Sequence, residues 1–183
     1  APEFDGHYGD AFTVSLHTIG GMSDTQAFSI TVQNTITVNS TADPGDDTCD
    51  LTECTLREAI TLSNATPGTD TIIFNIDNTT FPLQNGAHTI QPDGVGLPTI
   101  SDRVIIDGTT EPDFAGTPVI ELGGTNAGPG ANGLFITAGD SVVQSLVLNR
   151  FTDFGLNLAI GGSNVVRGNY VGTDVTGTLP RPN

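Results

Sequence analysis

Six pairs of residues in the second half of the chain match at a constant offset of 22 positions, and this repeat constrains the fold more than any other feature. A period near 22, built from short apolar segments and tight turns, is typical of a parallel β-solenoid, whose layers bury their inner faces only by stacking. A β-sandwich is the competing interpretation, but it favours longer alternating strands and hairpin turns. The six pairs are Gly133/Gly155, Leu134/Leu156, Ile136/Leu158, Gly139/Gly161, Ser141/Ser163 and Val143/Val165.

Short apolar segments separated by Gly, Pro, Asn and Asp fill the chain from residue 71 onward. The 183 residues include 23 Gly and 11 Pro, which implies many turns, and only 14% of the residues are charged. Long amphipathic helices need charged outer faces, so this composition favours a β-rich protein. The expected strands are residues 35–41, 71–76, 88–90, 103–106, 119–122, 134–137, 142–148, 156–160 and 165–171.

One helix is predicted, over residues 55–63. Thr55 and Glu58 have the spacing of a capping box, in which each side chain accepts a hydrogen bond from the backbone N–H of the other. The Pro- and Gly-containing segment 64–68 ends the helix. We expect this helix to cover the apolar end of the solenoid, because uncovered strand edges invite aggregation. The side chains expected to face inward are Leu56, Ala59 and Ile60.

The N-terminal segments 12–18 and 28–32 alternate apolar and polar residues on either side of a Gly-Gly turn cluster, which predicts a β-hairpin. This stretch resembles the last two strands of cadherin-like repeats in bacterial surface proteins. A complete domain of that kind needs about 100 residues. Residues 1–34 are therefore interpreted as the tail of such a repeat or as a linker.

The formal net charge is −16, from 21 acidic residues and five basic residues that are all Arg. A surface this negative repels nucleic-acid phosphates and anionic lipid head groups, so we expect neither as a partner. No apolar run approaches the roughly 18 residues that a transmembrane helix needs. Membrane insertion is therefore not expected either.

Cys49 and Cys54, the two cysteines of the chain, lie five positions apart. They predict a local disulfide, which suits an oxidising, extracellular compartment, with a pair of free thiols as the alternative. The histidines are scattered and the chain has no CxxC motif, so a zinc site is not expected. The three histidines are His7, His17 and His88.

Five carboxylates lie within eleven residues around these cysteines. Carboxylate oxygens on a loop are ligands that Ca²⁺ prefers, although the spacing here is not that of an EF-hand. The alternative is a solvated acidic turn closed by the disulfide. Calcium is therefore the one candidate cofactor, and its candidate ligands are Asp43, Asp46, Asp47, Asp50 and Glu53.

Asp107, Glu111 and Asp113 form the best carboxylate cluster for polysaccharide hydrolysis, which needs two carboxylates about 5–10 Å apart. Their segment is first of all a turn, since Asp107-Gly108 is a standard turn pair. Cleavage of acidic sugars by a lyase needs cations beside the uronate, and the chain has no Lys and five dispersed Arg. We therefore expect no enzymatic activity and assign no catalytic residue.

The segment Cys54-Thr55-Leu56-Arg57-Glu58-Ala59 resembles the defining motif of the CSLREA-motif family, with Thr in place of the usual Ser. Segments 37–43, 64–72 and 164–174 also resemble that family, so the resemblance covers about residues 35–178. Its members are large bacterial secreted or surface proteins in which the motif opens a right-handed parallel β-helix. The resemblance implies that architecture and an extracellular or cell-surface location. The family has no assigned catalytic residues to carry over.

The predicted fold is therefore all-β: a right-handed parallel β-helix of the pectin-lyase-like type, with a short N-terminal capping α-helix and a preceding β-hairpin. The expected divisions are the hairpin in residues 1–34, an entry strand, acidic cysteine loop and capping helix in 35–70, and β-helix turns in 71–183.

The expected function is a non-catalytic structural or adhesive module of a large secreted or cell-surface bacterial protein. Its expected partners are other copies of itself, joined end to end, or neighbouring domains of the same protein, and surface glycans are a further candidate. A polysaccharide-active enzyme and a calcium-dependent binding module are the alternatives.

Overall fold

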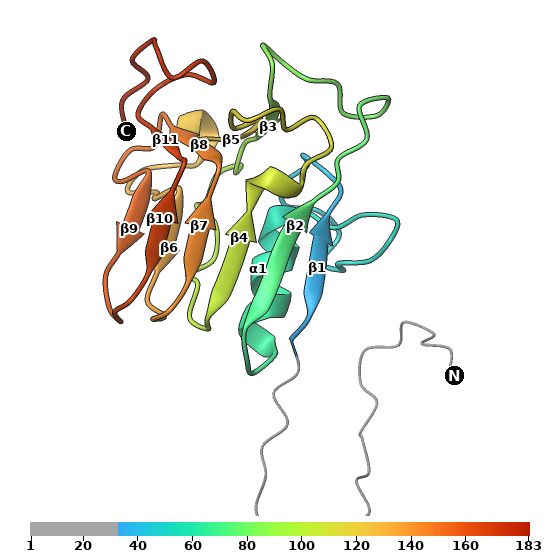
Figure 1. The fold of residues 1–183 in the computed structure, drawn as a ribbon, viewed down its shortest axis with the longest axis vertical. Coiled ribbons are helices and arrows are strands. Elements are labelled where there is room, and N and C mark those ends of the chain that lie inside the picture. Colours follow the sequence, from blue (N-terminus) through green and yellow to red (C-terminus); the bar gives the residue numbers. More distant parts are fainter. Residues whose placement is uncertain (1–32) are drawn as a thin grey trace, which may run out of the picture. The chain divides into compact units, whose positions relative to one another are not determined.

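Five parallel strands form the largest sheet within residues 33–183, which are the residues that the computed structural model describes (Figure 1). Two further sheets have four and two strands, and every ladder between named strands is parallel. The first sheet has the order β1 (Thr35–Val38), β2 (Asp70–Phe74), β4 (Val104–Asp107), β7 (Val142–Gln144) and β10 (Val165–Arg167). The second has the order β11 (Tyr170–Val171), β8 (Leu146–Asn149), β5 (Ile120–Gly123) and β3 (His88–Ile90), and the third pairs β6 (Leu134–Ile136) with β9 (Leu156–Leu158).

Neighbouring strands come from segments far apart in the chain, as parallel pairing requires. In the first sheet the offset between paired residues is 36 from β1 to β2, 34 from β2 to β4, 37 from β4 to β7 and 23 from β7 to β10. The third sheet has an offset of 22. The repeat seen in the sequence is therefore confined to the last strands, and longer connections separate the earlier ones.

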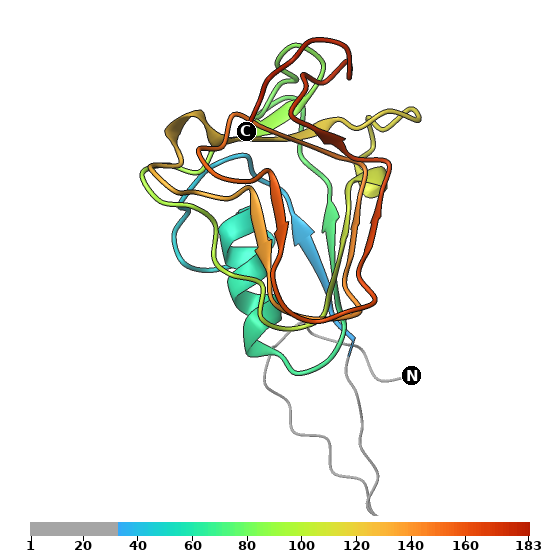
Figure 2. The ribbon, with the colours of Figure 1, turned by 90° about the vertical axis from the view of Figure 1, so that its left-hand side faces the viewer.

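The helix α1 (Leu56–Ala65) begins where the sequence predicts it. Thr55 is its N-cap: the threonine hydroxyl accepts a hydrogen bond from the Glu58 N–H (3.3 Å), and Glu58 Oε2 accepts one from the Thr55 N–H (2.7 Å). The predicted capping box is thus confirmed. The helix packs against β1 and β2 (Figure 2). Its three expected inward-facing residues, Leu56, Ala59 and Ile60, are buried.

The core lies between the sheets and α1, and it draws aliphatic side chains from nearly every strand. Two 3₁₀ turns, η1 (Gly108–Thr110) and η2 (Gly124–Asn126), follow β4 and β5. The largest fully buried side chains include Phe74, Ile36, Leu56, Ile60, Ile72, Ile90, Ile106, Leu122 and Leu134.

Two apolar runs that the sequence predicts as single strands are each divided by a residue in the left-handed region. Ser145 (φ 57°) separates β7 from β8, and Gly168 (φ 63°) separates β10 from β11. Each bend passes the chain from the first sheet to the second. The two corners stack on each other, since a Cβ at residue 168 would lie 3.3 Å from Ser145 Oγ.

The predicted fold class, an all-β right-handed parallel β-helix with a capping helix and a preceding hairpin, is wrong. The described residues have an α/β arrangement of three parallel sheets and one α-helix. The physical reason is that the 22-residue repeat holds only for the last strands and does not extend to the whole chain. Residues 35–142 depart from it, because α1 and long loops occupy the connections there.

The predicted hairpin of residues 12–32 lies outside the described residues. Within residues 33–183, no helix has the length and apolar character needed to cross a bilayer.

Candidate functional site

The five carboxylates predicted as calcium ligands lie in the loop between β1 and α1, but they have different surroundings. Asp43 forms a bidentate ion pair with Arg57, with N–O distances of 2.8 and 2.9 Å. Asp50 Oδ1 accepts two hydrogen bonds from backbone N–H groups at the end of the loop, and these lower the pKa of Asp50. Asp47 is exposed on a left-handed turn (φ 69°). These three carboxylates do not converge on one point.

The other two, Asp46 and Glu53, converge with Glu58 of α1. One carboxylate oxygen of each residue lies within 4.8 Å of those of the other two. Glu58 is buried, whereas Asp46 is exposed, so the cluster opens to solvent on the side of the loop. The sequence interpretation assigned Glu58 only to the capping box. Its position three residues into a helix that directly follows the loop is the signal that could have placed it in the cluster.

The predicted disulfide between Cys49 and Cys54 is confirmed. Asn39, the residue after β1, holds the same loop: Asn39 Oδ1 accepts a hydrogen bond from the Cys54 N–H (2.7 Å), and Asn39 Nδ2 donates to the Leu51 carbonyl (3.2 Å). The loop is therefore anchored where it enters α1. A disulfide is compatible with an extracellular protein.

A second cluster joins His88 of β3 to Glu111 and Asp113, which follow η1. His88 Nε2 lies 3.7 Å from Glu111 Oε1 and 3.4 Å from Asp113 Oδ2, and the side chains of His88 and Glu111 are fully buried. Burial raises the pKa of Glu111, and the neighbouring Asp113 charge acts in the same direction. A hydrogen bond from the Ile76 N–H (3.1 Å) and the nearby His88 oppose this rise in the pKa.

The sequence interpretation grouped Glu111 and Asp113 with Asp107 and left out His88. Asp107 instead accepts a hydrogen bond from the Thr109 N–H (2.9 Å) and caps η1. His88 comes from β3 and the two carboxylates come from the segment that follows η1, and local sequence patterns do not reveal that these segments meet.

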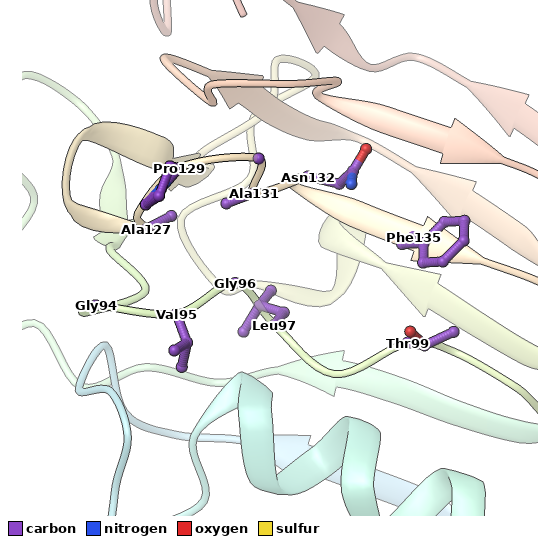
Figure 3. Close-up of a pocket in the computed structure, with 11 residues that line it drawn as sticks. Gly94, Val95, Gly96, Leu97, Thr99, Ala127, Pro129, Ala131, Asn132 and Phe135 are labelled. Carbon is purple, nitrogen blue, oxygen red and sulfur yellow. The ribbon is translucent and has the colours of Figure 1, made fainter.

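An open cavity of about 420 Å³ lies between loop 94–99 and loop 127–132 (Figure 3). Thr99 and Asn132 are the polar side chains among its lining residues, and no ionisable side chain of the described residues lines it.

A second cavity, of about 360 Å³, is polar and has Glu121, Arg150 and Asp174 in its lining. Glu121 Oε1 accepts hydrogen bonds from Arg150 Nη2 (3.0 Å) and Asn149 Nδ2 (2.8 Å). The Thr176 hydroxyl and backbone N–H groups donate to Asp174 Oδ1 and lower the pKa of Asp174. A carboxylate with a lowered pKa is a poor proton donor at neutral pH.

β9, β10 and β11 are the last strands of the three sheets (Figure 1). They expose apolar side chains whose ladder partners are buried. Val166 of β10 is 43% exposed and its partner Val143 of β7 is 1% exposed. Leu158 of β9 is 42% exposed and its partner Ile136 of β6 is fully buried. We call this surface the terminal face, and it consists of Phe154, Leu158, Ile160, Val165, Val166 and Val171.

Comparison of the chain with known protein families, with curated proteins and with solved structures finds no match.

Proposed function

We propose that the protein is a structural module of an extracellular protein and that it associates with a second copy of itself through the terminal face. The difference in burial between the last strands and their ladder partners carries this proposal. Leu158 of β9 and Val166 of β10 continue the rows of apolar side chains that form the core in the preceding strands. No described residue covers these two side chains on the side away from the preceding strands. Removing such apolar surface from water is favourable by about 25 cal/mol per Å².

The backbone at the terminal face also favours strand addition. Within residues 33–183, β9, β10 and β11 are the last strands of their sheets, so no described strand pairs with the outer N–H and C=O groups of these strands. The C-terminal segment covers the corner near β11, where the Arg181 N–H donates to the Gly172 carbonyl (2.8 Å). Among the described residues no strand occupies the outer edges of β9 and β10, and a strand of a second copy could pair there.

A two-fold contact suits this edge. Two copies related by a two-fold axis would place β10 antiparallel to β10 of the other copy, and an isologous contact of this kind closes as a dimer. We therefore expect a discrete dimer.

The segment that carries the terminal face differs in net charge from the chain as a whole. Residues 150–183 carry three Arg and two Asp, a local charge of +1, whereas the whole chain carries −16. Contact through most other surfaces would bring like charges together, which costs free energy. A second copy can therefore approach the region around the terminal face with little repulsion.

The enzymatic alternative has weaker support. Among the described residues, no ionisable side chain lines the cavity between loops 94–99 and 127–132, and hydrogen bonds hold Glu121 and Asp174 in the second cavity. Buried Glu111 and its neighbour Asp113 line neither cavity.

Sedimentation velocity of the full chain over a range of concentrations tests the proposal. We expect the average mass to rise from monomer to dimer, and we expect added NaCl to favour the dimer because salt screens the net charge. The variants Val166→Lys and Leu158→Lys place a charge on the edge and should shift the equilibrium at least tenfold toward monomer.

Leu51→Lys is the matched control, because Leu51 is 99% exposed in the acidic loop, away from the terminal face. It should dimerise like the unchanged chain. A chain that stays monomeric at all concentrations would overturn the proposal, and so would edge variants that dimerise as well as the control.

A further inference from the structure

We propose that Asp46, Glu53 and Glu58 bind one Ca²⁺ ion where the acidic loop meets the start of α1. This inference does not depend on the association proposed above, because the three residues lie outside the terminal face.

The spacing of the three carboxylates fits a single ion. Oxygens from all three lie within 4.8 Å of one another. Ca²⁺ holds oxygen ligands at about 2.3–2.6 Å, so two ligands on opposite sides of it are about 5 Å apart and adjacent ligands are closer. All three oxygens can therefore contact the same ion. Water can fill the remaining positions, since Asp46 is exposed.

One carboxylate oxygen of Glu58 is buried and available to contact a cation. Glu58 is 6% exposed, and its Oε2 accepts the hydrogen bonds of the capping box. Glu58 Oε1 is buried and has no hydrogen-bond partner. A buried carboxylate oxygen without a partner is costly. This oxygen faces the backbone of Gly45, the residue next to Asp46, so it points toward the loop that carries the second ligand.

In Asp46 and Glu53, as in Glu58, one carboxylate oxygen accepts a hydrogen bond from the described residues and the other does not. Asp46 Oδ1 accepts a hydrogen bond from the Thr48 N–H (2.9 Å), and Glu53 Oε1 accepts one from the Ser40 hydroxyl (3.0 Å). Among the described residues, no hydrogen bond engages the second oxygen of either carboxylate. Each ligand is thus oriented through one oxygen and has its other oxygen available for an ion.

No cationic side chain of the described residues neutralises this cluster. Arg57 is the nearest arginine in sequence, but it pairs with Asp43 and donates to the carbonyls of Val95 and Gly96. Three carboxylates this close repel one another unless a cation lies between them. The helix dipole contributes only about half a positive charge at this end of α1, which three carboxylates outweigh.

The surrounding structure holds the ligands in place before an ion binds. The disulfide closes the segment between Cys49 and Cys54, and the capping box fixes the Glu58 side chain. Calcium suits such a site better than Mg²⁺, because Mg²⁺ requires near-ideal octahedral geometry and gives up its waters reluctantly.

Calorimetric titration of the full chain with CaCl₂, together with thermal melts in CaCl₂ and in EDTA, tests the site. We expect one ion per chain and a Tm that rises with Ca²⁺, with a dissociation constant in the range of extracellular calcium modules, about 10⁻⁴–10⁻³ M. Glu58→Gln should weaken Ca²⁺ binding at least tenfold. Gln is accepted at this position of a capping box, so the helix keeps its cap. In EDTA this variant should melt no lower than the unchanged chain, because it loses a repulsion.

Asp47→Asn is the matched control. It removes one negative charge from the same loop, and Asn tolerates the left-handed backbone of residue 47 (φ 69°). It should bind Ca²⁺ like the unchanged chain. The proposal is overturned if the unchanged chain binds no Ca²⁺ at about 10 mM, well above that range. It is also overturned if Asp47→Asn weakens binding as much as Glu58→Gln, or if Mg²⁺ at equal ionic strength raises the Tm equally.

Discussion

Gly45 lies directly against the carboxylate of Glu58, with no room for a side chain between them. A Cβ atom at residue 45 would overlap Glu58 Oε1 and lie 2.8 Å from Thr55 Cγ2. Gly45 also has a φ of +87°, which L side chains rarely adopt. The acidic loop can therefore approach the start of α1 only because residue 45 is glycine.

Gly45→Ala should destabilise the protein through both effects. The left-handed backbone alone costs about 1–2 kcal/mol for a residue with a Cβ, and the overlap with Glu58 adds to it. Gly116→Ala is the control, because Gly116 has a φ of +100° and a Cβ atom added there would meet nothing within 4 Å. Urea denaturation should show a larger decrease in the free energy of unfolding for Gly45→Ala than for Gly116→Ala. Equal decreases would mean that the contact with Glu58 does not contribute to stability.

The ion pair between Arg57 and Asp43 should stabilise the fold far more than the other arginine pairs at the surface. Its side chains are 16% and 1% exposed, and Arg57 also donates to two carbonyls of loop 94–99. Arg57→Ala leaves a buried carboxylate without its partner and should cost about 3 kcal/mol. Arg103→Ala breaks the pair with Asp140, whose side chains are 47% and 55% exposed, and should cost less than about 1 kcal/mol. Chemical denaturation at neutral pH compares the two variants, and similar losses would contradict this ranking.

The local elements could be predicted from the sequence because they depend on neighbouring residues. Thr55 and Glu58 are three positions apart and form their capping box within one helical turn. The apolar runs mark nearly every strand for the same reason. The corner at Ser145 could not be predicted, since a serine gives no signal for a positive φ. The fold class could not be predicted, because the 22-residue repeat relates only residues 133–143 to residues 155–165. It carries no information on the segments before residue 133.

The candidate sites could be predicted only in part, because they join residues from different elements. Asp46 and Glu53 belong to an obvious acidic run, whereas Glu58 reaches them from α1. His88 and Glu111 are 23 positions apart and come from β3 and from the segment after η1. Neither contact follows from spacing along the chain.

Leu56 should be among the residues least tolerant of a charge. It is fully buried at the start of α1, where it packs into the common core. Leu56→Asp buries an unpaired carboxylate and removes apolar contacts, so we expect a loss of about 4 kcal/mol or failure to fold. Leu51→Asp makes the same chemical change at a 99% exposed position five residues earlier and should change stability by less than about 0.5 kcal/mol. Thermal melts followed by circular dichroism distinguish the two, and a Leu56→Asp variant that melts like the unchanged chain would contradict the buried role of α1.

Glu111 should make the protein less stable as its carboxyl group ionises. Burial raises the pKa of Glu111 in the folded state above the ordinary value of 4.5. The favourable contribution of the protonated form is therefore complete below pH 4.5 and is lost as the pH rises through the folded-state pKa. Glu111→Gln keeps an acceptor for the Ile76 N–H but cannot ionise, so its stability relative to the unchanged chain should increase from pH 4 to pH 8.

Asp77 is expected to have the opposite pH dependence, because hydrogen bonds from the Thr79 hydroxyl and N–H lower the pKa of Asp77. The contribution of ionised Asp77 is present above its ordinary value of 3.8 and is lost as the pH falls. Asp77→Asn should therefore lose stability relative to the unchanged chain as the pH rises from about 2 to 5, across the unfolded-state pKa. Urea denaturation over the two pH ranges measures both differences, and a change of the same sign for the two variants would contradict the buried environment of Glu111.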